Sequence, residues 1–167
     1  CASVLQTSPA ECDVQNFPHR YSVRAAATAD GVDVELAANG LARFATASPA
    51  EFGGPGDRWS PETLLVGAVA DCFVLTFRAV ANASKLPWQS LACDAAGTLD
   101  RIDGVMRFTA IELRARLVVA PGTDAAVARR ALEKAERGCL IANSLRADTH
   151  LEIAIEIAAE PALAAVR

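Results

Sequence analysis

The clearest pattern in the chain is a long apolar stretch, Trp59–Phe77, that opens with helix-starting residues. The hydroxyl of Ser60 can cap the first turn, Pro61 suits the first helical position, and Glu62 places negative charge at the positive end of the helix dipole. Apolar residues then occupy almost every face, which is typical of a helix buried in a core or an interface. The pattern predicts a central helix over residues 61–84.

Alternating apolar and polar positions predict strands on both sides of this helix. In the clearest case, residues 106–119, Ile111, Leu113 and Leu117 face one way and charged residues the other. Asn39-Gly40 is typical of a tight hairpin turn. The predicted order is β-β-β-α-β-β-α-β, an α+β fold with mostly antiparallel strands and two long central helices. The remaining expected elements are strands over 21–28, 32–38, 41–47, 91–99 and 151–157, a helix over 124–137 capped by Thr123 and followed by a left-handed Gly138, and a helical turn over 139–145.

The 167 residues fit one domain with a substantial core. We expect a loose N-terminal arm over 1–18, a single domain over 19–160 and a short tail over 161–167. Hydrophobic residues make up 52% of the chain, which excludes intrinsic disorder. The start shows no basic segment followed by an apolar one, so we expect no signal peptide.

Charge and cysteine usage narrow the functional classes. A net charge of −4 argues against nucleic-acid binding. The apolar run 64–77 carries Asp71 and is too short to span a bilayer, so we expect no membrane association. Five widely spaced cysteines do not form a disulfide framework, and without C-x-x-C, and with two histidines, we expect no metal site. This cysteine usage fits a reducing compartment, the cytoplasm, better than an oxidising one.

Two cysteines are candidates for chemistry. Cys72 lies inside the apolar helix, where a buried cysteine commonly serves as a small hydrophobe with a raised pKa. Cys139 follows a helix end and opens a new turn, whose free amides favour a thiolate. Cys93 is expected in the core, and Cys1 and Cys12 are expected to be incidental.

The residues around both cysteines resemble the OsmC/Ohr family, the osmotically inducible and organic-hydroperoxide-resistance proteins. The resemblance rests on S-P-E-T-L-L-x-G-A-x-A-D-C-F over 60–73 and on K-A-E-R-G-C-L-I-A-N-S-L over 134–145. It implies an intertwined homodimer with two interface sites and a thiol peroxidase that needs no metal, haem or other cofactor. It also implies that Cys72 attacks the hydroperoxide and that Cys139 resolves the product into a disulfide, which an external thiol or dithiol reductant then reduces.

The family's glutamate falls on Glu62, which normally pairs with an arginine from the first strands. Here the first hairpin has no arginine, so Arg24 is the first candidate for this partner, and Arg43 and Arg58 are the next candidates. This departure, together with Asp71 beside the cysteine, places the chain in the broader OsmC branch rather than the Ohr branch.

Geometry adds a condition. Ten residues of helix span roughly 15 Å, so Glu62 cannot touch Cys72 of its own straight helix. If both serve one site, the helix must break or a second subunit must bring its Glu62 across. Two other readings stay open: a dimer that binds a small hydrophobic ligand at its interface, its cysteines being structural or redox-sensing, and a structural dimer module without a ligand.

Overall fold

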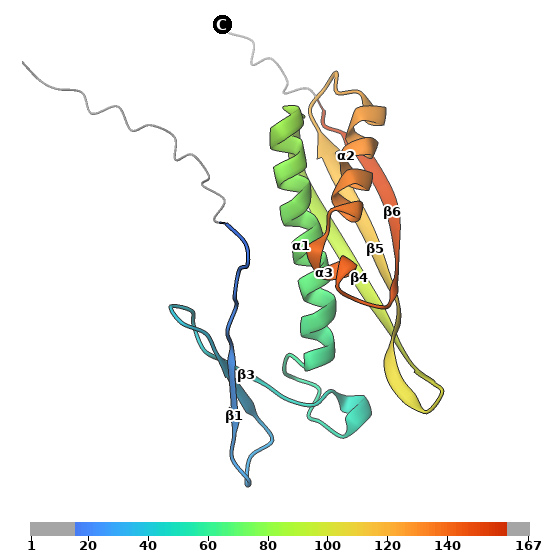
Figure 1. The fold of residues 1–167 in the computed structure, drawn as a ribbon. Coiled ribbons are helices and arrows are strands. Elements are labelled where there is room, and N and C mark those ends of the chain that lie inside the picture. The colour runs from blue at the N-terminus through green and yellow to red at the C-terminus, as the bar shows by residue number, and fades with distance from the viewer. Residues whose placement is uncertain (1–15, 160–167) are drawn as a thin grey trace, which may run out of the picture.

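The computed structural model describes residues 16–159, so most of the expected arm and all of the expected tail lie outside the described residues. Two three-stranded sheets flank a long helix in the chain (Figure 1). The element order confirms the predicted α+β arrangement. The elements are β1 (Arg24–Ala27), β2 (Val34–Ala37), β3 (Phe44–Thr46), the short 3-10 helix η1 (Ala50–Phe52), α1 (Pro61–Ser84), β4 (Trp88–Ile102), β5 (Val105–Val119), α2 (Ala125–Arg137), α3 (Leu140–Asn143) and β6 (Asp148–Ile157).

Helix α1 begins and ends where the sequence predicts. The Ser60 hydroxyl accepts from the amide of Thr63, and the Thr63 hydroxyl accepts from the amide of Ser60, which closes a capping box. Lys85 adopts the left-handed conformation that ends the helix, two residues before the proline. One row of side chains is fully covered and packs on the large sheet; its members are Val69, Phe73, Phe77 and Ala81.

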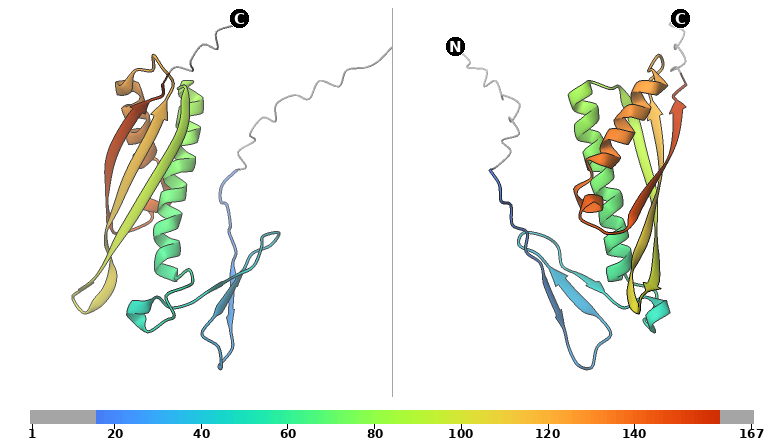
Figure 2. Two further views of the ribbon diagram at one scale, coloured as in Figure 1. Left: turned by 180° about the vertical axis from the view of Figure 1, so that it is seen from behind. Right: turned by 45° about the vertical axis from the view of Figure 1, so that its right-hand side comes forward.

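The large sheet has the order β4-β5-β6 and carries α1 and α2 on one face (Figure 2). β4 and β5 form a long antiparallel hairpin, whose turn at Asp103-Gly104 has positive φ at both residues. β6 pairs with β5 in parallel, because α2 and α3 carry the chain back to the start of β5 before β6 begins. The inward positions of β5 are buried and its charged positions are exposed, as the alternation predicts.

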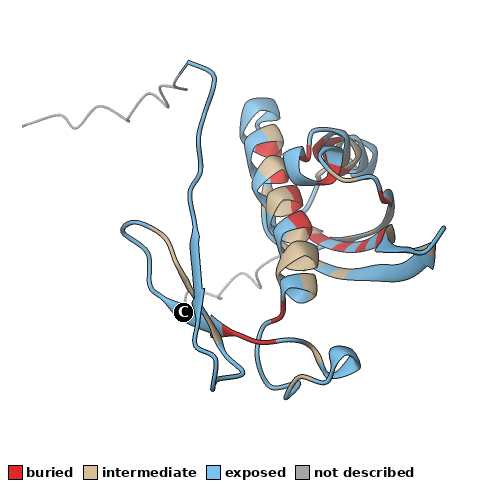
Figure 3. Ribbon diagram, turned by 60° about the horizontal axis from the view of Figure 1, so that its bottom comes forward, coloured by how far each residue is buried: buried red, intermediate tan, exposed pale blue. Residues whose placement is uncertain are grey.

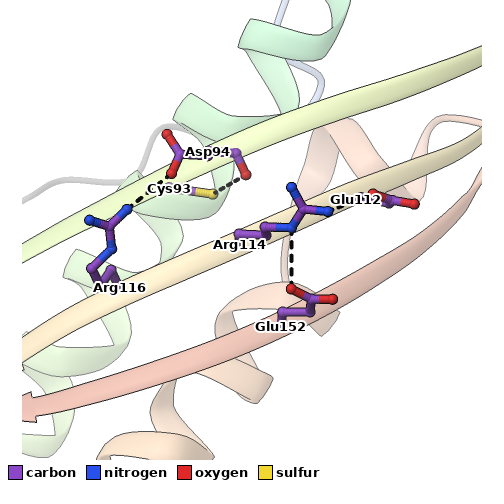
Figure 4. Close-up of polar contacts among 6 residues, drawn as sticks. All are labelled: Cys93, Asp94, Glu112, Arg114, Arg116 and Glu152. Carbon is purple, nitrogen blue, oxygen red and sulfur yellow. Dashed lines mark hydrogen bonds and ion pairs between the residues drawn. The ribbon is translucent and has the colours of Figure 1, made fainter.

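The outer face of this sheet is polar and carries ion pairs between strands (Figure 4). Arg114 contacts Glu152 on β6 and Glu112 on its own strand, and Arg116 contacts Asp94 on β4. These pairs are exposed, so each contributes between zero and about 1 kcal/mol. This face is therefore solvated and does not form part of the core.

The small sheet β1-β2-β3 stands apart from the body of the same chain (Figures 1 and 3). Its strands are shorter than the predicted segments, and most of its residues are exposed. It is tied to α1 by one backbone bond, from the amide of Ala47 to the carbonyl of Trp59. Large apolar side chains are left uncovered in and beside it, including Tyr21, Val23, Val32, Leu41 and Phe44.

Two local predictions around α2 are wrong. The cap of α2 is Asp124, whose carboxylate accepts from the amide of Ala126 at 2.7 Å, and not Thr123. Gly138 is in the right-handed region, with φ −91°, so it is not a left-handed terminator. A side chain there would instead crowd α1, because a Cβ would lie 3.2 Å from the methyl carbon of Thr76. Gly138 thus permits close packing of two elements.

By length and composition, α1 is apolar enough to cross a bilayer, in contrast to the expectation drawn from the shorter run 64–77. Its buried row, however, forms the centre of the core with the inward residues of β5 and α2. The central helix of a folded domain is apolar because its side chains are buried in the core, and this accounts for the hydropathy of α1.

Candidate active site

Cys72 and Cys139 meet where α1 packs against α3. Cys72 lies midway along α1 and is partly buried, whereas Cys139 is fully buried as the residue that caps α3. The two thiols interact and shift each other's pKa, and neither is in a disulfide. The fold therefore brings together two thiols that are far apart in the sequence.

Burial raises the pKa of Cys72, but hydrogen bonds outweigh it. The thiolate accepts from the amides of Ile141 and Leu140, from the thiol of Cys139 and from the hydroxyl of Thr76, so the net pKa lies below the ordinary value. The amides belong to the first residues of α3. Cys72 is thus not the inert buried hydrophobe that its apolar surroundings suggest.

Burial raises the pKa of Cys139, and its hydrogen bond to Cys72 raises it further. The amides of Ala142 and Ile141 lower the pKa of Cys139, as expected for free amides at the start of a turn, but burial and the neighbouring Cys72 outweigh them, so the net pKa is raised. The single proton of the Cys139 thiol has two nearby acceptors, the Cys72 sulfur and the carbonyl of Val69, whose oxygen lies 3.8 Å from the Cys139 sulfur. The pair thus consists of one favoured thiolate and one protonated neighbour.

Cys93 on β4 behaves as a core cysteine, as expected. Burial, the charge of Asp94 and the nearby Cys139 raise its pKa to about 11. Its thiol donates to the carbonyl of Asp94 at 3.9 Å (Figure 4). At neutral pH it stays protonated, which makes it a poor nucleophile. Cys1 and Cys12 lie outside the described residues.

Glu62 lies at the edge of a different feature, a cavity of about 680 Å³ between the start of α1 and β4. The cavity is largely apolar, with Trp59, Val66, Leu99 and Phe108 in its wall. One carboxylate oxygen of Glu62 is buried and has no hydrogen-bond partner. An unpaired buried acceptor is costly, so this oxygen requires a donor that the described chain does not supply.

Within one chain, Glu62 and Cys72 do not form a single site. The helix between them is unbroken, so about 15 Å and about 80° of rotation separate the two side chains. Cys72 is also not among the residues that line the Glu62 cavity. Because α1 does not break, a site that contains both Glu62 and Cys72 requires a second subunit.

The three candidate arginines all lie on or near the small sheet. Arg43 pairs with Glu35, and Arg58 pairs with Asp33 and Asp57. Arg24 on β1 is exposed and makes no ion pair with any residue of the described part. The structure does not bring Arg24 to Glu62 within one chain, and Arg24 remains the arginine without a competing carboxylate.

Sequence reasoning missed Thr76 and the aromatic wall of the Glu62 cavity. Thr76 follows Cys72 by four residues, a spacing that places two side chains on one helix face and could have identified it. Phe108 comes from the far end of the β4–β5 hairpin, and no local signal relates it to Glu62. Within residues 16–159, no group of three or more metal-ligating side chains is gathered.

The fold is an α+β arrangement with a long central helix, and it brings two free thiols together. A family model described as OsmC-like protein matches residues 54–154. The chain therefore belongs to the OsmC-like family, whose members include organic hydroperoxide resistance proteins.

Three relatives illustrate the match. An uncharacterized protein of Bacillus subtilis, YmaD, is 27% identical over 81% of this chain and 92% of its own. The peroxiredoxin OsmC of Escherichia coli is 29% identical over 56% of this chain and 64% of its own. The structure of an OsmC-like protein of unknown function from Vibrio cholerae superposes with a TM-score of 0.76 at 18% identity, covering 82% of this chain and all of that one.

Proposed function

We propose that the protein is a thiol-dependent peroxidase that reduces organic hydroperoxides, as part of defence against oxidative stress in the cytoplasm. Membership of the OsmC-like family and similarity to a peroxiredoxin support peroxidase chemistry in general. The observation that carries the specific proposal is the pair of neighbouring free thiols, in which the pKa of Cys72 is lowered and that of Cys139 is raised.

The first step is nucleophilic attack by Cys72. Its thiolate sulfur bonds to the outer oxygen of the hydroperoxide, the O–O bond breaks, and the departing alkoxide takes a proton to leave as an alcohol. Cys72 becomes a sulfenic acid, oxidised by two electrons. A lowered thiol pKa raises the fraction of reactive thiolate at neutral pH.

The second step uses Cys139. Its sulfur attacks the sulfenic sulfur of Cys72, an S–S bond forms, and the sulfenic oxygen leaves as water with the Cys139 proton. A dithiol reductant then restores both thiols by exchange and is itself oxidised to a disulfide. The closeness of Cys139 to Cys72 supports this proposed role, since a resolving thiol beside the intermediate would limit further oxidation.

We infer that the working unit is an intertwined homodimer. The small sheet and one face of α1 leave apolar side chains uncovered in the single chain; Leu75 on α1 is 51% exposed and Tyr21 beside β1 is 90% exposed. A second copy that covers them would bring its Glu62 toward Cys72, and an arginine, in our proposal Arg24, would satisfy the unpaired Glu62 oxygen. A guanidinium held there would also stabilise the thiolate.

Peroxide consumption with a dithiol reductant tests the enzyme proposal. We expect wild type to consume cumene hydroperoxide and Cys72→Ser to lose turnover. Cys93→Ser is the matched control, since it removes a thiol that stays protonated. Equal rates for wild type and Cys72→Ser would remove the proposal.

Mixing two inactive variants tests whether the site is shared between subunits. Dimers of Cys72→Ser and of Glu62→Gln should each be inactive. If Cys72 and Glu62 act across the dimer, a mixed dimer retains one intact site, and unfolding and refolding an equal mixture should restore roughly a quarter of wild-type activity, as two-fold symmetry requires. No recovery in a mixture shown to contain mixed dimers would mean that both residues act within one chain.

The Glu62 cavity favours a second candidate function, the binding of a small hydrophobic ligand without turnover. Its volume and apolar wall are typical of small-molecule sites. A binding protein would retain ligand affinity in the Cys72→Ser variant and would show no thiol-dependent consumption of hydroperoxide. The turnover assay therefore separates the two functions.

A further inference from the structure

We propose that Thr76 is a further catalytic residue, whose hydroxyl donates a hydrogen bond to the Cys72 thiolate and holds it in its reactive form. The hydrogen bond is proposed for the Cys72 thiolate itself. Only its role in catalysis rests on the proposed peroxidase function. Three features of the structure support it: the helical spacing of the two residues, the hydroxyl's choice of acceptor and the contact made by the Thr76 methyl group.

The spacing places the two side chains on one face of α1. Residues four apart are neighbours on a helix, and side chains lean toward the helix N-terminus, so Thr76 leans toward Cys72. The Thr76 hydroxyl is one of the groups that lower the pKa of Cys72. Thr76 is itself partly buried, which reduces competition from water for the proposed hydrogen bond.

The acceptor distinguishes Thr76 from other hydroxyls on helices of this chain. Ser84 at the end of α1 donates to the carbonyl of Val80, and Ser144 after α3 donates to the carbonyl of Leu140, both at 2.8 Å and both four residues earlier. This is the common behaviour of helical hydroxyls. Within residues 16–159, Thr76 makes no such backbone bond, which leaves its proton for the Cys72 sulfur, and it lowers the pKa of that thiol.

The methyl group of Thr76 fixes the orientation of the hydroxyl. Its carbon lies against Gly138, where an added Cβ would be only 3.2 Å away. A threonine in a helix has few allowed rotamers, so a contact that holds the methyl group also holds the hydroxyl. The turn that carries Cys139 therefore supports the donor that faces Cys72.

Thr76 differs from the other donors in its attachment. The amides of Leu140 and Ile141 and the Cys139 thiol all belong to the α2–α3 segment. Thr76 shares a rigid helix with Cys72, so its bond persists if that segment shifts while the disulfide forms. It is the one donor of the four that does not depend on the position of Cys139.

Few titratable groups face this sulfur in the described chain. Cys139 faces it from the α2–α3 turn, and Cys93 on β4 interacts with Cys139 but stays protonated below a pKa of about 11. Asp71 is the neighbour of Cys72 on α1 and is exposed. The charged residues at the end of α2, Lys134 and Arg137, lie before the turn.

The test is the pH dependence of Cys72 alkylation by monobromobimane in protein whose other four cysteines are serine, read with and without Thr76→Val. Valine keeps the shape and the contact with Gly138 and removes the hydroxyl. We expect the midpoint pH to rise by about one unit, and the rate well below both midpoints to fall about tenfold, since a hydrogen bond to a charged group is lost. Thr76→Ser should return the midpoint toward that of threonine, and Thr149→Val, a substitution on β6, should leave it unchanged.

An unchanged midpoint in Thr76→Val, or the same raised midpoint in Thr76→Ser, would overturn the assignment, because the effect would then be absent or due to the methyl contact. If valine prevents folding, Thr76→Ser against Thr76→Ala makes the same comparison without the methyl group. Alkylation needs no hydroperoxide, so a shifted midpoint in a protein without turnover would sink the proposed peroxidase and leave the Thr76 assignment standing.

Discussion

The thiol of Cys139 donates to the main-chain carbonyl of Val69 at 3.8 Å, three residues before Cys72 on α1. This bond holds the protonated thiol against the helical turn that carries the candidate nucleophile. It also means that Cys139 must give up a hydrogen bond when its sulfur attacks. Reduction of the disulfide would restore this bond.

Removing Cys139 should separate the two proposed steps. In Cys139→Ser, Cys72 should still react with one equivalent of hydroperoxide, because the amides of α3 and Thr76 remain as donors. Without the resolving thiol, Cys72 should gain one oxygen atom from the first equivalent of hydroperoxide and a second oxygen atom when a further equivalent is added, as the oxidation ladder requires. Intact-protein mass spectrometry checks this; quantitative disulfide formation in the variant would show that another cysteine resolves the intermediate.

The three described cysteines should react with alkylating agents at different pH. The pKa of Cys72 is lowered, that of Cys139 is raised, and burial raises that of Cys93 to about 11. The thiolate fraction rises as pH approaches the pKa, so as pH rises Cys72 should be labelled before both Cys139 and Cys93. Peptide mapping after brief labelling from pH 6 to pH 11 follows each site, within the ordinary range for thiols. Labelling of Cys93 ahead of Cys72 would contradict the electrostatics of the pair.

The uncovered face of α1 should control assembly. Leu75→Asp places a charge on a side chain that is 51% exposed in the single chain, so it should cost the fold little. If this face is the dimer interface, burying the charge is unfavourable, and the variant should sediment as a monomer and lose turnover. Ala154→Asp, on the solvated outer face beside Arg114 and Arg116, should leave both properties unchanged. A dimeric, active Leu75→Asp would place the interface elsewhere.

Two glycines in the wall of the Glu62 cavity should respond in opposite directions. A Cβ on Gly67 would meet Trp59 at an ordinary 3.8 Å, so Gly67→Ala should stabilise α1 by about 1 kcal/mol through helix propensity. A Cβ on Gly97 would lie 2.7 Å from both Phe108 and Val66, so Gly97→Ala should cost about 1–3 kcal/mol through overpacking. Urea unfolding measures both. Equal unfolding free energies of the two variants would mean that Phe108 and Val66 in the cavity wall move aside without cost.

Much of the fold could be predicted from sequence because its signals are local. The cap at Ser60 fixed the start of α1, and the alternation in β5 fixed which side chains face the core. The small sheet was harder to predict. Residues just beyond the ends of its strands have a strand-like sequence pattern but pair with no other strand within residues 16–159. The cap at Asp124 was missed because Thr123 beside it is an equally good capping residue.

The candidate site was predictable only in part. The motifs identified Cys72, Cys139 and Glu62, but no pattern told which thiol has the lower pKa, because amides of α3 act on both sulfurs and the balance depends on burial and on the contact between the two thiols. Gly138 was interpreted as a helix terminator, whereas its role depends on Thr76, more than sixty residues earlier. Contacts between distant segments carry no local signal, and the thiol chemistry depends on them.

The most direct measurement is to mix reduced protein with one equivalent of cumene hydroperoxide, quench within seconds with acid, and map the cysteines by mass spectrometry. The proposed chemistry predicts one dominant product, a disulfide between Cys72 and Cys139 that a dithiol fully reverses. Unmodified thiols, or oxidation scattered over several cysteines without that disulfide, would contradict it.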